Sequence, residues 1–391
     1  MVILKIDQGI INYLAWISAG LGTLTKGPVG FILPAGTILI YILVTRQFKL
    51  LLKVKSITGP IVFLIVTAPW YVQVCRANPD FFDFFFINQN LLRYTTTMHE
   101  RYKPFWYFVP VVIVGFLPWT FMLPAVVKQV WKNRPPLASE VWFTIIWFAV
   151  TFLFFIPSQS KLATYVLPCF MPLALLTGYA SHKADPETRL GFSCAVAIWL
   201  IIGAALTVVP FIHTSGIFDA MQHPERITPV IRYGVIMGTV MLVGSLLAIM
   251  AARNCGTVSG FALLGITLMF SGLGFSGQWD GMRSTRDIVH HLPANAQLCA
   301  YGRYYHSAAF YGRRPLYLVG TMGELAFGQS HPNTLTISRE EFFSRLHTRK
   351  DFYCLTKTDR LVSIMENAPN VTIVAHQGDM VLIQGSGGDG F

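Results

Sequence analysis

The sequence predicts a polytopic α-helical membrane protein of about nine transmembrane helices, followed by a C-terminal, extracytoplasmic small α/β domain. Three observations lead to this fold class. Hydrophobic residues make up 53% of the 391 residues and charged residues only 13%, a composition typical of integral membrane proteins. Long apolar runs recur through the first part of the chain, and basic residues collect in the connections between them. After residue 277 short strand-like runs replace the long ones.

The apolar runs come first along the chain. A helix needs about 20 mostly apolar residues to cross the hydrocarbon of a bilayer. The runs that approach this length cover residues 8–25, 28–45, 57–75, 105–127, 141–157, 164–181, 190–212, 229–251 and 256–276. We therefore expect residues 1–277 to form a helical transmembrane domain.

The short connections between the runs predict the orientation, because basic residues there stay preferentially in the cytoplasm. Three alternate connections are basic, through Arg46, Lys49, Lys53, Lys55, Lys128, Lys132, Arg134 and Arg253. With these connections inside, an odd number of spans places everything after residue 277 outside the cytoplasm. The connection at residues 76–104 then becomes an outer amphipathic loop.

The C-terminal part is expected to be the α/β domain, at residues 278–385. Its strand-like runs are "QLCAY", "PLYLV", "DFYCL", "VTIVA" and "MVLIQ". The stretch "SREEFFSRLHT" places Ser338 three residues before Glu341, which predicts a capped helix. Cys299 and Cys354 are the two cysteines of this domain, and a disulfide between them is left open. The Gly-rich residues 386–391 are expected to be a flexible tail.

Chemistry is expected at the outer connections. In "LTKGP", Lys26 ends the first run and Gly27-Pro28 predict a tight turn into the next helix. A lysine at the end of a span commonly lifts its charge to the interface. The alternative is a cation that meets a lipid phosphate at headgroup depth.

The outer loop combines aromatic and polar residues. The phenylalanines, tyrosines and tryptophan of residues 78–110 suit the headgroup boundary, where they would form an aromatic belt. The polar residues are denser than a belt requires: Asn88, Asn90, Arg93, His99, Glu100, Arg101 and Lys103. His99 is a weak candidate for a divalent metal ligand, more often a surface histidine, and no cofactor is implied with certainty.

The third stretch, "IPSQSKLATYVLP", joins two runs through a very short outer turn. Lys161 and Tyr165 are four residues apart, so on a helix they would share one face and both could contact one phosphate. The alternative is that both residues anchor the chain at the interface.

Together these stretches resemble a known family. The pattern "LTKGP", then "NPDFF", "RY", "PFWYF" and "LPW", then "SKL" and "TYVLP" closely resembles membrane glycosyltransferases typified by the 4-amino-4-deoxy-L-arabinose transferase of lipid A and the related protein O-mannosyltransferases. The resemblance covers about residues 15–180. It implies a multi-pass protein of the bacterial inner (plasma) membrane with a periplasmic C-terminal domain.

The resemblance also implies a function and partners. Such enzymes move a sugar from a polyprenyl-phosphate donor to a lipid A, protein or glycan acceptor at the outer face of the membrane. The residues in the matching motifs that would meet the phosphates are Lys26, Arg93, Arg101, Lys103, Lys161 and Tyr165. Fixed cations suit this reaction, because the leaving phosphate gains negative charge in the transition state.

One departure from the family pattern bears on catalysis. The family carries a catalytic acidic motif after its first span, whereas the first span here resembles a middle span of the family. We therefore expect this chain to be a form that lacks the family's N-terminal spans. Whether this form is active by itself is left open. No residue is assigned as catalytic; Asp83 and Glu100 are weak substitutes for the missing base.

Other classes fit the sequence less well. The net charge of +11 is divided between inner loops and an outer loop. No helix is predicted to present a basic face with interleaved aromatic residues, the pattern that would indicate nucleic-acid binding. A transporter would carry polar or interrupted segments at the bilayer midplane, whereas here the ionisable residues collect at the span ends. A noncatalytic membrane scaffold that presents the tail domain remains the alternative to an enzyme.

Overall fold

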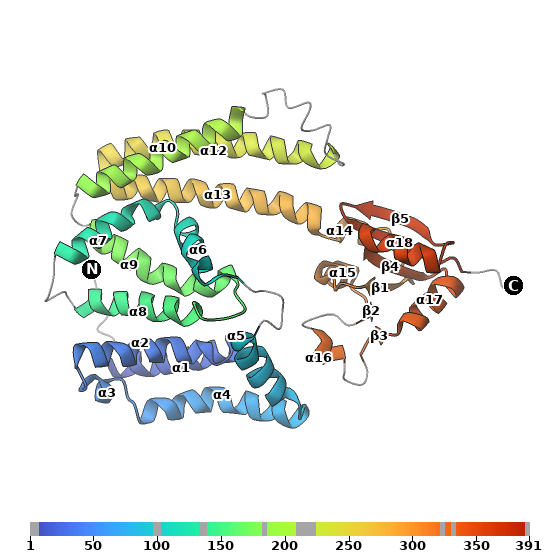
Figure 1. The fold of residues 1–391 in the computed structure, drawn as a ribbon, viewed down its shortest axis with the longest axis horizontal. Coiled ribbons are helices and arrows are strands. Elements are labelled where there is room, and N and C mark those ends of the chain that lie inside the picture. Colours follow the sequence, from blue (N-terminus) through green and yellow to red (C-terminus); the bar gives the residue numbers. More distant parts are fainter. Residues whose placement is uncertain are drawn as a thin grey trace. The chain divides into compact units, whose positions relative to one another are not determined.

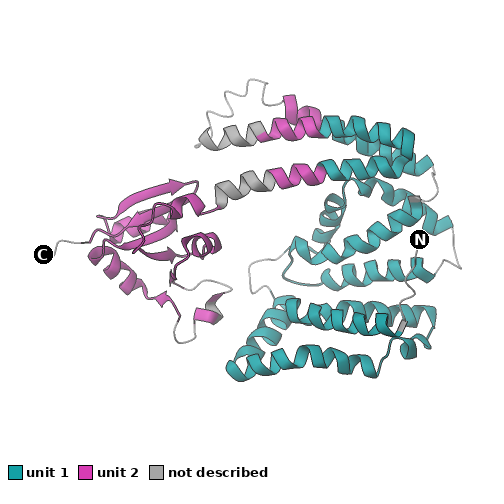
Figure 2. Ribbon diagram, turned by 180° about the vertical axis from the view of Figure 1, so that it is seen from behind, with its two compact units in different colours: residues 1–202, 241–267 teal, residues 203–240, 268–391 magenta. Residues whose placement is uncertain are grey.

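The computed structural model describes residues 8–96, 103–132, 139–181, 186–208, 224–320, 325–329 and 334–387. The chain divides into two compact units (Figure 2). The first comprises Met1–Ile202 and Met241–Thr267, and the second comprises Gly203–Val240 and Leu268–Phe391. Each unit is described by itself below.

Helix forms in every one of the apolar ranges that the sequence predicts (Figure 1). The uninterrupted helices are α1 (Gln8–Lys26), α2 (Val29–Thr45), α4 (Thr58–Ala77), α8 (Ser139–Phe155), α9 (Phe170–Ser181), α10 (Pro186–Val208), α12 (Pro224–Cys255) and α13 (Thr257–Arg283). A single turn, α3 (Leu50–Lys53), connects α2 to α4, and the 3₁₀ segment η4 (Ala163–Cys169) leads into α9. In the first unit α1 lies beside α2 and α4, and α2 lies beside α8.

Five stretches of the described residues are long and apolar enough to cross a membrane alone: Thr58–Ala77, Ala163–Ala180, Pro186–Val208, Tyr233–Cys255 and Thr257–Gly274. Helices α2 and α8 are apolar but have 17 residues each. At 1.5 Å per residue they reach about 26 Å, less than the ~30 Å of hydrocarbon. The polytopic helical fold is confirmed, and the described residues supply five such spans, or six with one bent pair, out of the nine that were predicted.

The bent pair occupies the fourth predicted span, residues 105–127. Its first part is η2 (Phe105–Tyr107) with α6 (Phe108–Gly115), its second is η3 (Trp119–Met122) with α7 (Leu123–Lys132), and the two parts are bent by 99°. Pro118 lies at the break, where it removes a backbone donor and disfavours helical geometry in Leu117. The predicted span at residues 105–127 is therefore sharply bent and does not form one straight helix.

The C-terminal residues form the predicted small α/β domain. The sheet has the order β3-β2-β1-β4-β6-β5, in which β3, β2, β1 and β4 are parallel and β6 and β5 run antiparallel. The strands are β1 (Gln297–Tyr301), β2 (Leu316–Val319), β3 (Thr336–Ile337), β4 (Phe352–Lys357), β5 (Thr372–Gln377) and β6 (Met380–Gln384). The helices are α14 (Arg286–Val289), α15 (His306–Gly312), α16 (Ala326–Gln329), α17 (Arg339–Thr348) and α18 (Thr358–Asn367). All five predicted strands are confirmed; the two-residue β3 was not predicted.

The sheet is buried on both faces. Residues of α14 and α15 pack on one face, and residues of α17 and α18 pack on the other. The predicted helix begins at Ser338, whose hydroxyl accepts the backbone N–H of Glu341 at 3.1 Å. Helix α13 ends at Arg283, six residues beyond the boundary at residue 277 that the sequence predicts between the two domains. That boundary stays a prediction.

Cys299 and Cys354 are direct neighbours on the parallel strands β1 and β4. Both are fully buried free thiols. Burial, together with the hydrogen bond to Cys354, raises the pKa of the Cys299 thiol well above its usual value. In the thiol form the pair therefore behaves as small core residues.

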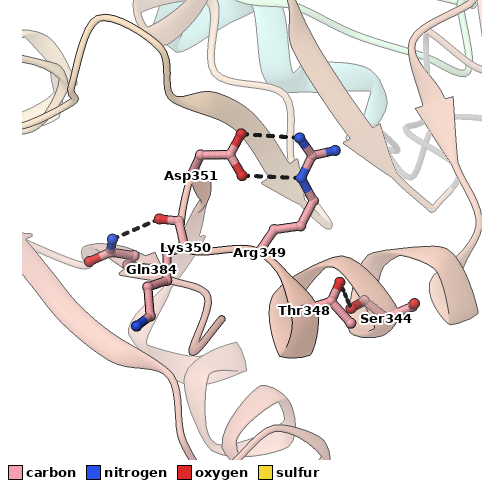
Figure 3. A network of polar contacts seen from close by, with 6 residues as sticks. All are labelled: Ser344, Thr348, Arg349, Lys350, Asp351 and Gln384. Carbon is pink, nitrogen blue, oxygen red and sulfur yellow. Dashed lines mark hydrogen bonds and ion pairs between the residues drawn. The ribbon is translucent and has the colours of Figure 1, made fainter. Parts of the chain in front are cut away.

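The connection from α17 to β4 is fixed by polar contacts (Figure 3). Arg349 donates from Nε and Nη2 to the two carboxylate oxygens of Asp351, each at 3.1 Å. Gln384 of β6 donates to the carbonyl oxygen of Lys350 at 2.7 Å. These contacts fix where β4 starts relative to β6, and so stabilise the register of the central strands.

Candidate functional site

The three stretches that the sequence singles out all lie in the first unit. The middle one connects the other two. It folds into the π-helix η1 (Asp83–Leu92), followed directly by one turn of α-helix, α5 (Arg93–Thr95). π-Helical segments are rare in proteins and occur frequently at functional sites.

The turn between α1 and α2 rests against η1. Gly27 has φ +86°, which favours glycine, and its backbone N–H donates to the carbonyl oxygen of Thr23 at 2.8 Å. A Cβ at Gly27 would lie 3.1 Å from Oδ1 of Asn90 and 3.2 Å from the ring of Phe85, so the turn touches η1. The tight turn predicted at Gly27 and Pro28 is confirmed, and it lies beside the aromatic segment.

Tyr71 of α4 strengthens this contact. Its hydroxyl donates to the carbonyl oxygen of Thr23 at 3.0 Å, near the end of α1. Its ring lies 5.9 Å from the ring of Phe85 and 5.2 Å from that of Phe86. One side chain thus contacts both the end of α1 and η1.

At its other end the middle stretch joins the turn after α8. The hydroxyl of Tyr94 donates to the carbonyl oxygen of Phe154 at 2.6 Å, and the two rings are 5.3 Å apart. The backbone N–H of Gln159 donates to the carbonyl oxygen of Tyr94 at 2.9 Å. Residues 83–95, called the bridging segment below, therefore connect the turn at Gly27 with the turn at residues 156–162.

Lys161 has the most unusual environment of the predicted site residues. It is only 5% exposed, and its Nζ donates to the carbonyl oxygen of Ser158. Beside it the hydroxyl of Ser158 donates to the carbonyl oxygen of Ser160 at 2.9 Å. The hydroxyl of Ser160 is buried and has no partner in the described part of the chain.

This environment favours an anion. Taking an ammonium group out of water costs several kcal/mol unless an opposite charge compensates it. No carboxylate of the described residues forms an ion pair with Lys161. Burial accordingly lowers the pKa of Lys161. A phosphate oxygen next to this group would supply the missing negative charge and also accept from Ser160.

Tyr165 does not pair with Lys161 in the way the spacing predicts. Lys161 precedes the helical segment, which starts at Ala163, and Leu162 is extended with φ −122° and ψ 141°. The two side chains therefore do not share one helix face, and that geometric prediction is wrong because a helix was assumed to include Lys161. The ring of Tyr165 lies 5.2 Å from that of Phe155, at the edge of a buried apolar cluster.

The other predicted residues differ in exposure. Lys26 is exposed at the end of α1, and Lys103 is exposed just before η2. Arg93 is half-buried in α5, with Nη1 3.4 Å from Oε1 of Gln89. The structure thus links the segments that carry Lys26, Arg93 and Lys161.

Three further predictions concern residues near the loop. His99, Glu100 and Arg101 lie outside the described residues. Asp83 is exposed at the start of η1. Within the described ranges no three residues among His, Cys, Asp and Glu are grouped so as to hold a metal ion.

Sequence reasoning missed Tyr71 and Tyr94. A tyrosine near the end of an apolar helix is a weak signal, because its hydroxyl needs a polar partner when it is buried. The partners, however, lie 48 and 60 residues away along the chain.

Comparisons with known proteins match the C-terminal domain and also longer parts of the chain. The family model described as "Aminoarabinose transferase C-terminal domain" matches residues 284–385. A relative in Erwinia tasmaniensis, named undecaprenyl phosphate-alpha-4-amino-4-deoxy-L-arabinose arabinosyl transferase, is 31% identical over 202 residues, 48% of this chain and 36% of the relative. A relative of the same name in Edwardsiella ictaluri is 26% identical, and the match covers 82% of this chain and 59% of the relative.

Solved structures agree over nearly the whole chain. The crystal structure of ArnT from Cupriavidus metallidurans bound to undecaprenyl phosphate superposes with a TM-score of 0.81 at 26% identity, covering 98% of this chain and 70% of that one. The apo structure of the same protein gives a TM-score of 0.79 at 25% identity. Against the curated relatives described above, the matched region spans from about a third to three fifths of their length.

Proposed function

Because this chain is related to the 4-amino-4-deoxy-L-arabinose transferases in sequence and in fold, we propose that it binds an undecaprenyl-phosphate-linked sugar and takes part in its transfer. The chain is a multi-pass protein of the bacterial inner membrane. The observation that carries the proposal is Lys161, a buried ammonium whose described neighbours include no carboxylate in ion-pair contact.

The chemistry of the transfer gives this cation a role. When the sugar leaves, the lipid phosphate gains negative charge, and a fixed cation in a water-poor site stabilises that charge more than an exposed cation does. Lys161 would meet the phosphate directly, assisted by the hydroxyl of Ser160. Lys26, Arg93, Arg101, Lys103 and Tyr165 remain proposed contacts to donor or acceptor phosphates.

The sugar and the acceptor are proposed from the relatives. Their names specify a 4-amino-4-deoxy-L-arabinose carried by undecaprenyl phosphate. We extend this donor to the present chain and propose lipid A as the acceptor at the outer face of the membrane. Protein and glycan acceptors remain alternatives that an acceptor assay would separate.

Binding of undecaprenyl phosphate to the purified chain of residues 1–391 in detergent tests the proposal. We expect saturable binding of one lipid per chain, measured by native mass spectrometry, and much weaker binding of undecaprenol, which has no phosphate. Equal binding of the two lipids would contradict a phosphate site and favour the scaffold alternative. Incubation with the aminoarabinose-loaded lipid and lipid A then reports transfer.

The C-terminal domain is proposed to be periplasmic. The basic residues at the ends of α2, α7 and α12 support an inner location for those ends. Alkaline phosphatase fused after residue 387 is therefore expected to be active, because the enzyme folds only outside the cytoplasm. A cytoplasmic reporter at the same position serves as control, and activity of that reporter alone would reverse the orientation.

A further inference from the structure

A groove of about 610 Å³ lies on the first unit at the N-terminal end of α10 and the C-terminal end of α12. It is distinct from the site described above, since none of its lining residues belongs to the turns at residues 26–28 and 156–162 or to the bridging segment. Arg189, Arg253, Ser193 and Thr257 line its polar part.

Close helix packing lies next to the groove at Phe192, which lines it. A Cβ at Gly260 of α13 would lie 2.5 Å from the ring of Phe192 and 2.9 Å from the carbonyl oxygen of Ala248. The rings of Phe192 and Phe261 meet edge to face at 5.4 Å. This contact brings α10, α12 and α13 together, so the apolar lining is held in place rather than formed by loose side chains.

The apolar part of the groove extends along the helices. Phe192 is mostly buried, whereas Ala197 is exposed and Leu200 is half-buried one to two turns farther along α10. A helix rises 1.5 Å per residue, so the apolar wall from position 192 to position 200 extends about 12 Å. That length suits an acyl chain and exceeds what a free anion requires.

The polar end is positively charged. Arg189 and Arg253 are exposed, and neither forms an ion pair with a carboxylate of the described residues. Glu187 is the acidic residue of α10 nearest to them in sequence, and it is paired with Lys128 of α7. The groove thus presents two guanidinium groups whose charge the surrounding described carboxylates do not neutralise.

We propose that this groove binds an anionic phospholipid, with the phosphate at Arg189 and Arg253 and one acyl chain along Phe192, Ala197 and Leu200. Basic pockets between transmembrane helices commonly bind acidic headgroups in this way. Since the basic ends of α7 and α12 are expected to be inside, the lipid would belong to the cytoplasmic leaflet.

Native mass spectrometry of the purified chain, titrated in detergent with phosphatidylglycerol or phosphatidylcholine, tests this proposal. The wild type should bind one phosphatidylglycerol more tightly than phosphatidylcholine. Each of R189Q and R253Q should lower the phosphatidylglycerol affinity about fivefold, since a basic residue near an anionic headgroup contributes about 1 kcal/mol. A197W should also lower it by filling the apolar wall, although it keeps both charges.

The control removes two positive charges elsewhere, against one in each groove variant. Lys49 and Lys53 are exposed near the end of α2 and do not line the groove, so the double variant K49Q/K53Q should retain the wild-type preference for phosphatidylglycerol. An equal loss in that control, or an unchanged affinity in A197W, would overturn the proposal. Competition by inorganic phosphate at low millimolar concentration would also overturn it, because the site would then bind a free anion.

Discussion

Replacing Lys161 with alanine is expected to lower the affinity for undecaprenyl phosphate by about ten- to a hundredfold. A hydrogen bond to a charged group contributes about 1.5–3 kcal/mol, which corresponds to this range. The effect should be at the upper end because Lys161 is 5% exposed, so little water screens its contact with the phosphate. Titration of the purified variant with undecaprenyl phosphate measures it.

Lys161→Met separates binding from folding. Methionine keeps most of the side-chain volume but removes the buried charge, and replacing a buried charge with an apolar group is often neutral or stabilising. We therefore expect an equal or higher melting temperature together with weaker lipid binding. A variant that melts earlier and binds normally would assign Lys161 a structural role.

Two further variants define the contact. Tyr165→Phe should lower the affinity by at most about tenfold, because it removes one neutral hydrogen bond and keeps the ring against Phe155. Lys132→Ala, at the end of α7, serves as the charge control and should bind normally. Because burial lowers the pKa of Lys161, the affinity should fall as the pH rises through that pKa, earlier than for an exposed lysine.

Gly30→Ala is expected to destabilise the first unit by about 1–3 kcal/mol, the usual effect of overpacking. A Cβ at Gly30 would lie 2.4 Å from the carbonyl carbon of Gly22 and 2.6 Å from the backbone nitrogen of Thr23. Backbone atoms cannot rotate away as a flexible side chain can, so α1 and α2 would have to separate. The expected result is a lower melting temperature in detergent.

Gly178→Ala is the matched control. Gly178 also lies within a helix, but a Cβ there would meet nothing within 4 Å. Alanine is the better helix former, so this variant should melt at the wild-type temperature or slightly above it. Equal melting of Gly30→Ala and wild type would contradict the close approach of α1 and α2.

The sequence alone predicted most elements of the fold. Strands β1, β2, β4, β5 and β6 and the helix capped by Ser338 follow from local patterns that need no distant partner. The apolar runs likewise predicted where helices form. Their number of complete spans did not follow, because Pro118 bends one run, two others are short and α1 is long enough but not apolar enough. Run length measures hydrophobicity but not backbone geometry.

The candidate site was only partly predictable. Motif residues such as Lys26 and Lys161 could be selected because they lie in the sequence motifs that resemble the known family. The burial of Lys161 could not be predicted, since it depends on segments that fold around the turn after α8. The contacts of Tyr71 and Tyr94 could not be predicted either, because each joins residues far apart along the chain.

The bridging segment is fastened at both ends, and this has an entropic consequence. Tyr94 and the backbone of Gln159 hold one end, while Gly27 and Tyr71 contact the other. A loop that must order itself around a ligand loses conformational freedom at that moment, which weakens the observed affinity. Here folding has already ordered residues 83–95, so a lipid headgroup that binds beside them would not have to order this segment.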